Sequence, residues 1–357
     1  MAKELSAVLE APYRLVLKEF DIPSVKGEAF LLRVEMVSIC GGDPIEYEGR
    51  NRKVHYPLIL GHEMVGFVEE VGEEAAATYG IQKGDRVTVE PYIACGRCQY
   101  CLSGFYQFCT RSRVYGVNVS CQDPPHLWGA YGQFMYVAPG SRVHKVDPAV
   151  PAAAACLSPV LGNGVRWVRT KARVKFGESV VVIGVGAQGL ATIIAAREAG
   201  AKPIIAAGKT RNPEKWDLAR EFGADYLVDT SQEDAITAVR RLTGGQGADV
   251  VVETTGVSAM MQLGLELARP AGRYILVGTN GFSETPLVSD LVVFKELEVI
   301  GGLGQSLDTE EAVKIINSRR YRLEKLITHV FPLEQADEAI KFYIRGGSTV
   351  NRVAIRP

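Results

Sequence analysis

The stretch VVVIGVGAQG, from Val180 to Gly189, decides the fold of the middle of the chain. Its four β-branched residues predict a short buried strand, and the glycines then follow in the pattern G-x-G-x-x-G. The next residues, LATIIAAREAG over 190–200, have helical composition and end in a glycine. A glycine-rich turn between a strand and a helix predicts a dinucleotide site, because its backbone can approach a pyrophosphate at the helix N-terminus. We therefore expect the cofactor to contact Gly184, Gly186, Ala187, Gln188 and Gly189.

Composition indicates an ordinary globular protein. The chain has 357 residues, is 47% hydrophobic and 23% charged, and carries a net charge of -1. Its length suggests two domains, since single cores stop growing at about 250–300 residues. The balanced charge gives no reason to expect nucleic acid or a membrane surface as a partner. Residues 1–10 lack the apolar core of a signal peptide and no run resembles a spanning helix, so we expect a cytoplasmic protein.

The chain divides into regions of different character. Over the first 150 residues, short strand-like stretches at 5–9, 30–37 and 86–89 predict a largely antiparallel β domain. From about Pro159, strands alternate with helices, which predicts βαβ units and a parallel sheet covered on both faces. The strands expected there are 180–183, 203–207, 226–228, 249–253 and 274–277, with helices such as 213–222 and 235–242 between them. Two further helices (309–318 and 333–345) and a final strand (351–355) follow.

Four cysteines in one short loop predict a structural zinc site. They are spaced C-x2-C-x2-C-x7-C, and four thiolates close a tetrahedral site without leaving a position for substrate. The chain has seven cysteines, and this clustering favours a metal over disulfides or chance. The absence of a basic helix disfavours a nucleic-acid zinc module. The predicted ligands are Cys95, Cys98, Cys101 and Cys109.

A second set of metal ligands comes from separate stretches. Cys40 lies in SICGGD after a strand-like run, and His62 and Glu63 lie in GHEMVG after another apolar run. A catalytic zinc takes three such protein ligands and keeps one position open. The spacing is not H-E-x-x-H, which disfavours a metalloprotease. Taken singly, each residue is more often a packing residue than a ligand.

These motifs, in this order, resemble those of the zinc-dependent medium-chain dehydrogenases, the alcohol-dehydrogenase-like family. The resemblance rests on Cys40 with Asp43, Gly61-His62-Glu63, the four-cysteine lobe and the turn at Gly184, and it covers essentially the whole chain. It implies an α/β protein in which a Rossmann doubly wound parallel sheet is inserted in a mostly β, GroES-like catalytic domain. The implied boundaries are 1–157 with 303–357 for the catalytic domain, with its zinc lobe at about 90–112, and 158–302 for the dinucleotide-binding domain. It also implies a homodimer or homotetramer.

The resemblance implies roles for the matching residues. Cys40 and His62 would be ligands of a catalytic zinc, with Asp43 orienting His62 and Glu63 close enough to approach the metal. In AAAACLSPVLGNG, Cys156 is the candidate third ligand, although alignment of Pro159 would place Ser158 there. Zinc would act as a Lewis acid on an alcohol or ketone, and hydride would pass between substrate and nicotinamide C4.

Two positions depart from the family's pattern. Gly42 stands where the family carries Ser or Thr, whose hydroxyl starts the proton route; His55, Tyr47 and solvent are the alternatives. Gly208 stands where an NAD-binding chain needs an acid for the ribose 2′-hydroxyl. The residues that follow offer positive charge and a hydroxyl to a 2′-phosphate, which favours NADP over NAD. The alternative is that they are ordinary polar residues of an exposed turn. They are Lys209, Thr210 and Arg211.

Strand ends complete the expected cofactor site. In doubly wound sheets, ligands bind at the carboxyl edge of the strands. We expect backbone contacts with the nicotinamide at Thr255, Gly256, Val277 and Gly278. Aromatic residues elsewhere are candidates for an apolar pocket or for ordinary core, namely Pro91, Tyr92, Trp128, Tyr131 and Phe134.

The sequence thus predicts a zinc-dependent oxidoreductase acting on a neutral secondary alcohol, cyclic ones included, or on its ketone. One alternative is a zinc-free reductase of the same fold that holds only the structural zinc. The other is a cofactor-binding protein without catalysis. Cys40, Asp43, His62 and Glu63 argue against both alternatives, whereas Gly42 and the uncertain third ligand keep them open.

Overall fold

The computed structural model describes residues 2–209, 212–347 and 350–357. It has two compact units: Met1–Pro159 with Val313–Pro357, and Val160–Ala312. The first boundary falls inside helix α5 (Ser158–Val165), close to the expected residue 158. The second falls inside α11 (Thr309–Asn317), later than the expected residue 303.

Unit 2, residues 160–312, is built on one six-stranded sheet. Its order is β13-β12-β11-β14-β15-β16, and every neighbouring pair is parallel. Numbered along the chain, this is the order 3-2-1-4-5-6 of a Rossmann fold, and the predicted doubly wound sheet is confirmed. The strands are β11 (Val180–Ile183), β12 (Ile204–Gly208), β13 (Tyr226–Asp229), β14 (Ala248–Glu253), β15 (Ala268–Leu276) and β16 (Glu298–Gly301).

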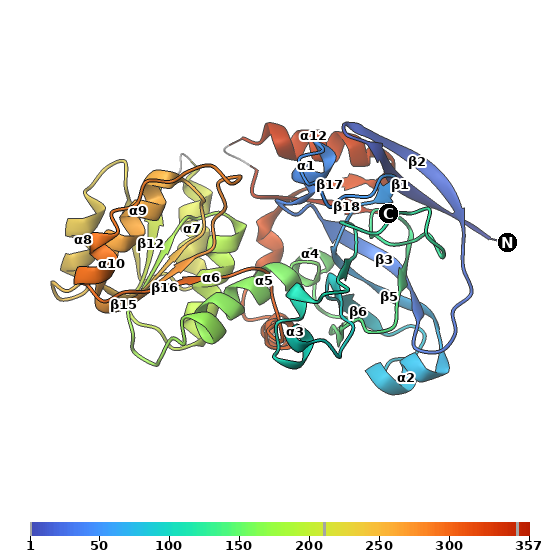
Figure 1. Cartoon of the computed structure of the whole chain (residues 1–357), viewed down its shortest axis with the longest axis horizontal. Helices are drawn as coiled ribbons and strands as arrows, with labels where there is room; N and C mark the ends of the chain where they lie inside the picture. Colours follow the sequence, from blue (N-terminus) through green and yellow to red (C-terminus); the bar gives the residue numbers. More distant parts are fainter. Residues whose placement is uncertain (1, 210–211, 348–349) are drawn as a thin grey trace. The chain divides into compact units, whose positions relative to one another are not determined.

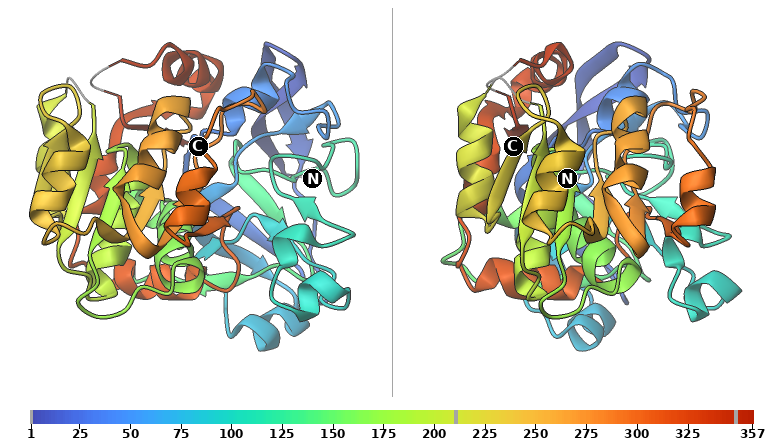
Figure 2. Two further views of the ribbon diagram at one scale, coloured as in Figure 1. Left: turned by 60° about the vertical axis from the view of Figure 1, so that its left-hand side comes forward. Right: turned by 90° about the vertical axis from the view of Figure 1, so that its left-hand side faces the viewer.

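Helices cover both faces of this sheet, because its inner strands are apolar on both sides. Val181 and Ile183 of β11 belong to one buried cluster with Val239 of α8 and Leu265 of α9. Val180 and Val182, which point to the opposite face, are equally buried. Figures 1 and 2 show α8, α9 and α10 on one side of the strands and α6 and α7 on the other. The helices are η2 (a π-helix, Arg166–Lys171), α6 (Ala187–Glu198), α7 (Pro213–Glu221), α8 (Ala235–Leu242), α9 (Ser258–Leu267) and α10 (Asp290–Phe294).

Unit 1 is mostly β and mostly antiparallel. A three-stranded sheet has the order β2-β1-β4, and a seven-stranded sheet has the order β10-β6-β5-β3-β18-β17, with β9 paired to β3. Strand β3 is buried along nearly its whole length, as expected for the centre of a sheet. The strands are β1 (Lys3–Ala11), β2 (Arg14–Asp21), β3 (Phe30–Ser38), β4 (Leu58–Ile59), β5 (Glu63–Val71), β6 (Arg86–Val89), β9 (Phe134–Val137), β10 (Val143–Lys145), β17 (Ile327–Pro332) and β18 (Arg352–Arg356).

The helices of unit 1 are short. They are α1 (Asp43–Tyr47), α2 (Glu73–Tyr79), α3 (Gln99–Leu102), η1 (Tyr106–Phe108), α4 (Ala152–Ala155), η3 (Leu323–Leu326), η4 (Leu333–Gln335) and α12 (Ala336–Arg345), and a small ribbon joins β7 (Tyr92–Ile93) to β8 (Arg113–Val114). The single helix expected over 333–345 is thus a 3-10 turn followed by α12.

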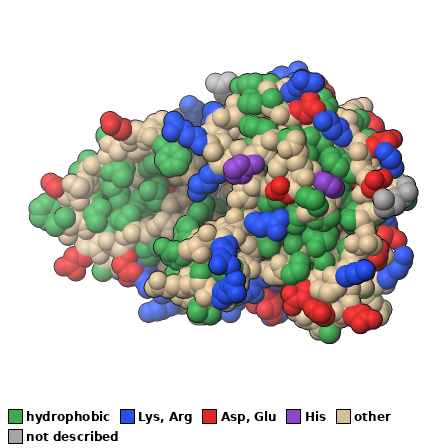
Figure 3. All heavy atoms as spheres, turned by 45° about the vertical axis from the view of Figure 1, so that its right-hand side comes forward, with side chains coloured by type: hydrophobic (Ala, Val, Ile, Leu, Met, Phe, Trp, Pro, Cys, Tyr) green, Lys and Arg blue, Asp and Glu red, His purple; other side chains and the backbone are tan. Residues whose placement is uncertain are grey.

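The surface mixes both signs of charge. Figure 3 shows Lys and Arg side chains interspersed with Asp and Glu, as the net charge of -1 leads one to expect. No helix among the described residues has the length and apolar character needed to cross a bilayer.

Candidate metal and cofactor sites

Cys40 is positioned by a tight turn between β3 and α1. Its backbone N–H donates to Asp43 Oδ2 at 2.9 Å, and Asp43 N–H donates back to the Cys40 carbonyl at 3.1 Å. This reciprocal pair fixes the thiol beside the N-terminus of α1, so Asp43 shapes the turn that carries the thiol.

His62 and Glu63 follow a glycine that the fold requires. Gly61 has φ +94°, and a Cβ there would stand 2.4 Å from the ring of Tyr131. Only glycine accepts both the backbone conformation and the contact. The ring of Tyr131 can therefore pass over the backbone, and its hydroxyl donates to Asp43 Oδ2 at 2.8 Å.

The predicted ligands gather at one place. One ligand atom each from Cys40, His62 and Glu63 lies within 4.8 Å of the others. Burial by itself lowers the pKa of His62. The neighbouring Cys40, Asp43 and Glu63 raise it by more, so that the net pKa is about 10. The donor set of thiolate, imidazole and carboxylate is one that Zn²⁺ prefers, so these residues fit the metal.

Asp43 lies next to His62 but does not form a full hydrogen bond with it. Its Oδ1 is 3.5 Å from His62 Nδ1, and both atoms are buried without a hydrogen-bond partner among the described residues. Burial raises the pKa of Asp43 to about 6, while His62 opposes the shift and Glu46 adds to it. The contact suits a carboxylate that orients the imidazole of a metal ligand.

Arg352 holds Glu63 in place, and the sequence analysis missed it. Arg352 Nη1, from β18, donates to Glu63 Oε2 at 3.0 Å and to the Ile39 carbonyl at 2.7 Å. Ser38 Oγ donates to the same Glu63 oxygen. Both charged side chains are almost fully buried. Because Oε2 has two donors and no described residue donates to Oε1, Oε1 is the oxygen open to a metal.

The third predicted ligand does not join the cluster. Cys156 is fully buried, and its Sγ donates to the Ala153 carbonyl at 3.6 Å. Burial raises the pKa of this thiol well above its usual range. Ser158, the alternative, shares a 2.7 Å hydrogen bond with Thr88 Oγ1. A ligand role for Cys156 stays a prediction that metal counting can test.

The structure separates the residues weighed as a proton route in place of a hydroxyl at Gly42. The Tyr47 hydroxyl donates to Asp337 at 2.8 Å, on the face of α12, and His55 is exposed. Tyr343, also from α12, was not considered from the sequence. Its hydroxyl lies 3.9 Å from the point where a Cβ on Gly41 would stand, beside the cluster.

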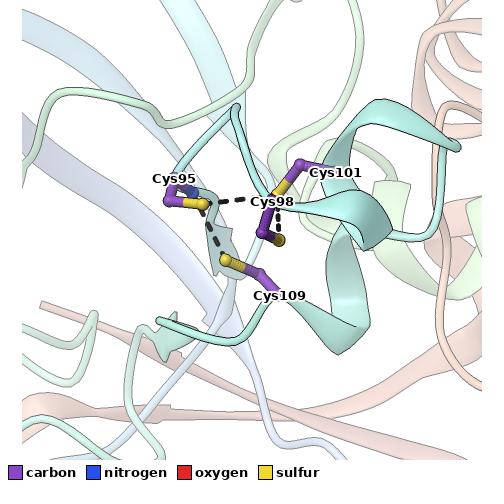
Figure 4. Close-up of side chains that lie close together, drawn as sticks. All are labelled: Cys95, Cys98, Cys101 and Cys109. Atoms are coloured by element: carbon purple, nitrogen blue, oxygen red, sulfur yellow. Dashed lines mark hydrogen bonds between the residues drawn. The ribbon is translucent and has the colours of Figure 1, made fainter.

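The four-cysteine lobe is assembled as predicted from the spacing. One sulfur from each cysteine lies within 4.8 Å of the others, and Figure 4 shows the four sulfurs turned toward one another. Backbone hydrogen bonds from Thr110 and Cys101 lower the pKa of Cys98 to about 6, whereas burial raises that of Cys101 to about 12. Four sulfur donors in this arrangement fit a closed zinc site.

A buried carboxylate fastens the lobe to the large sheet. Glu90, at the end of β6, accepts a hydrogen bond from the hydroxyl of Tyr106 in the lobe. Its other oxygen bonds His144 of β10 at 2.9 Å. The lobe, which has little core of its own, is thus tied to two strands through one side chain.

In unit 2 the glycine-rich turn has the shape a dinucleotide needs. A Cβ on Gly189 would stand 1.9 Å from the Gly184 carbonyl, so helix α6 packs directly on the turn. Nothing among the described residues lies within 4 Å of the corresponding point on Gly186, at the N-cap of α6. This open backbone at a helix N-terminus fits a pyrophosphate, with Ala187 and Gln188 in the first turn of that helix.

The end of β12 bears on the choice of cofactor. Gly208 is buried and Lys209 is exposed, whereas Thr210 and Arg211 lie outside the described residues. Asp229 of β13 pairs in register with Gly208. Hydrogen bonds from Ser231 lower the pKa of Asp229, with a smaller contribution from Lys209.

The other predicted strand ends pack closely at the carboxyl edge of the sheet. A Cβ on Gly256 would stand 2.2 Å from the Thr279 carbonyl, and one on Gly278 would stand 2.1 Å from Gly256 N. The Thr255 and Gly256 N–H groups donate to the buried Glu253 carboxylate at 2.6 and 3.1 Å. Val277 follows directly after β15 and is half-buried.

The aromatic candidates are mainly core. Trp128 is 2% exposed and packs against Tyr115 and Tyr136. Tyr131 is fully buried and uses its hydroxyl on Asp43.

Comparison with known proteins finds relatives for both parts of the chain. Residues 26–148 match the model of the alcohol dehydrogenase GroES-like domain, and residues 175–318 match that of the zinc-binding dehydrogenases. A probable alcohol dehydrogenase of Mycobacterium tuberculosis is 37% identical over 93% of this chain and 92% of its own. An erythritol/L-threitol dehydrogenase of Mycolicibacterium smegmatis is 33% identical over 99% of this chain and 98% of its own.

Solved structures extend the likeness to three dimensions. An alcohol dehydrogenase of Thermotoga maritima superposes with a TM-score of 0.92 at 29% identity, covering 100% of both chains. The GroES-like domain and the Rossmann sheet expected from the sequence are therefore both confirmed. The chain belongs to the zinc-type medium-chain alcohol dehydrogenase family.

Proposed function

We propose that this oxidoreductase transfers a hydride between a nicotinamide cofactor and a neutral secondary alcohol or its ketone, using a zinc ion held by Cys40, His62 and Glu63. The observation that carries the proposal is the gathering of these ligand atoms within 4.8 Å of one another. Zinc, when bound, supplies Lewis-acid polarisation of the substrate oxygen, and the nicotinamide accepts or gives the hydride.

The protein's own residues orient this chemistry. Asp43 and Tyr131 hold the imidazole and the thiol turn, and Arg352 and Ser38 hold Glu63. The three gathered ligands argue against a zinc-free reductase, and a non-catalytic protein has no need of them. Cys156 remains a further candidate ligand.

Metal content and turnover together test the proposal. Wild-type protein should contain zinc at both sites, and a Cys40→Ala variant should keep only the lobe zinc and lose turnover by at least about 100-fold. Cys121→Ala is the matched control, because Cys121 is a buried thiol outside both ligand groups. Zinc at the lobe alone in the wild type, or full turnover without Cys40, would refute the zinc mechanism.

For the cofactor we propose NADP, with NAD as the alternative. Gly208 carries no acid for a ribose 2′-hydroxyl, and exposed Lys209 offers a positive charge next to it. Lys209→Ala should raise KM for NADP and leave that for NAD unchanged. Asp229→Asn should have the opposite effect on NADP, because it removes a negative charge beside Gly208. Equal effects on both cofactors would refute the assignment.

We also propose that the protein is a homodimer formed along β16. This strand is the edge of the six-stranded sheet, and apolar side chains are exposed on it and next to it. Phe294 is 84% exposed, and the others are Val293, Val299 and Leu303. Light scattering should find a dimer for the wild type and a monomer for Phe294→Asp; a wild-type monomer would refute the proposal.

We also propose a cytoplasmic location, because thiolate metal ligands persist in a reducing compartment.

A further inference from the structure

Glu46 carries a buried carboxylate oxygen that lacks a donor. The residue lies in the last turn of α1 and is 5% exposed. Its Oε1 accepts a hydrogen bond from Asn51 Nδ2 at 2.8 Å. Its Oε2 is buried and has no hydrogen-bond partner among the described residues. A buried acceptor of this kind costs free energy until a donor reaches it.

This oxygen lies near one ligand of the candidate zinc site. A Cβ on Gly42 would stand 3.7 Å from Glu46 Oε2 and 3.9 Å from Cys40 Sγ. Apart from Gly42 and its two chain neighbours, no other described heavy atom lies within 4 Å of that point. A side-chain atom at position 42 would therefore lie at ordinary contact distance from a metal-ligand sulfur on one side and from an unpaired carboxylate oxygen on the other, and glycine leaves that position unfilled.

A purely structural role explains Glu46 poorly. Its bond with Asn51 uses only Oε1, and a glutamine would make the same bond. The second oxygen adds negative charge near Cys40 and Asp43, and it helps to raise the pKa of Asp43. No described Lys or Arg forms an ion pair with Glu46 to offset that charge. A donor brought by the substrate would satisfy Oε2.

We propose that Glu46 Oε2 accepts a hydrogen bond from a second hydroxyl of the substrate, on the carbon next to the one that is oxidised. The preferred substrate class is then the vicinal diol, one hydroxyl of which lies at the Cys40–His62–Glu63 site while the other reaches Glu46. The inference rests on the proposed function for the first of these hydroxyls. The glycine at position 42 keeps Glu46 Oε2 available to the substrate, because a serine there would occupy the position next to Oε2 and its hydroxyl would donate to that oxygen.

The test compares two substrates that differ by one hydroxyl, butane-2,3-diol and butan-2-ol, with the zinc-loaded protein and its nicotinamide. Wild type should favour the diol in kcat/KM by about 10- to 100-fold, the range expected for a hydrogen bond to a charged acceptor. Glu46→Gln should reduce that preference at least several-fold through KM for the diol, and leave kcat/KM for butan-2-ol within about two-fold. Gly42→Ser should reduce it in the same way.

Glu48→Gln is the matched control. Glu48 caps the same helix, but its carboxylate pairs with Arg50 at 2.6 Å, so the preference should be unchanged. Calorimetric titration of the diol into zinc-loaded protein with reduced cofactor gives Kd without turnover. Glu46→Gln should weaken this Kd by the same factor as it raises KM.

Three results would overturn the inference. They are a wild type indifferent to the second hydroxyl, equal losses on both substrates in Glu46→Gln, and a Glu46-dependent preference for a vicinal amino alcohol over the diol. If wild type oxidises neither alcohol, the proposed function fails. The diol Kd then still reports on Glu46, and a Kd unchanged by Glu46→Gln would overturn the inference separately.

Discussion

Replacing Arg352 by methionine should destabilise unit 1 strongly. Arg352 and Glu63 are 3% and 2% exposed, and their 3.0 Å contact is the ion pair that offsets the burial of the Glu63 charge. Methionine keeps much of the side-chain volume but leaves the carboxylate with Ser38 as its hydrogen-bond donor. Removing one partner of a buried ion pair typically costs about 3–5 kcal/mol. The Ile39 carbonyl also loses its 2.7 Å donor.

A double-mutant cycle in urea measures this loss. Arg352→Met should lower the free energy of unfolding by about 3–5 kcal/mol, and the added change Glu63→Gln should restore part of it by removing the stranded charge. Arg356→Met is the control, since Arg356 ends the same strand and is exposed; a change within about 0.5 kcal/mol is expected. A loss below about 1 kcal/mol in Arg352→Met, or no recovery in the double variant, would refute the argument.

Three other predictions concern the rest of unit 1. Cys101→Ser should remove the lobe zinc and lower the melting temperature, as metal analysis and calorimetry would show; unchanged zinc content would contradict the four-sulfur site. Gly61→Ala should lower the free energy of unfolding in urea by roughly 2–4 kcal/mol, because Gly61 has φ +94° and the new Cβ would stand 2.4 Å from the ring of Tyr131. An unchanged free energy of unfolding would mean that the ring moves freely. Burial raises the pKa of Glu4 from 4.5 to about 7, so stability should fall as pH rises through this window, by up to about 3 kcal/mol. Glu4→Gln should flatten that dependence in unfolding curves at pH 5 and 8, and an unchanged slope would assign it to another group.

The sequence predicted the parallel sheet well because its inner strands are buried on both faces. The strand over 180–183 and the helix over 235–242 have the bounds that were expected. Strand β16 was missed because it is short, lies at an edge and is mostly exposed, so it has no apolar run. Strand β5 was missed because Gly66 and the acidic pair Glu69 and Glu70 interrupt its apolar residues.

Site residues were predicted where a local motif carried them. Cys40, His62 and Glu63 stand in short recognisable stretches, and the structure brings them together. Arg352 is 289 positions from Glu63, and Tyr131 is 88 from Asp43, so no local spacing connects either pair. The available signal for Arg352 was a charged residue directly before three apolar residues, Val353 to Ile355.

Strand β18 lies between β3 and β17 in the large sheet, and this has a consequence during synthesis. A ribosome that adds about 5–20 residues per second reaches Arg352 roughly 15–60 s after Glu63, 289 residues earlier in the chain. Unit 2 is a single continuous stretch, and its sheet can form while the protein is still being made. In unit 1, β9 can already pair with residues 30–33 of β3, but Val37 and Ser38 still lack their partner strand β18, and the Glu63 carboxylate lacks its cation. The metal-binding pocket is thus finished late in translation, and a nascent chain stalled before β18 would expose a half-built ligand set to the cell's metals.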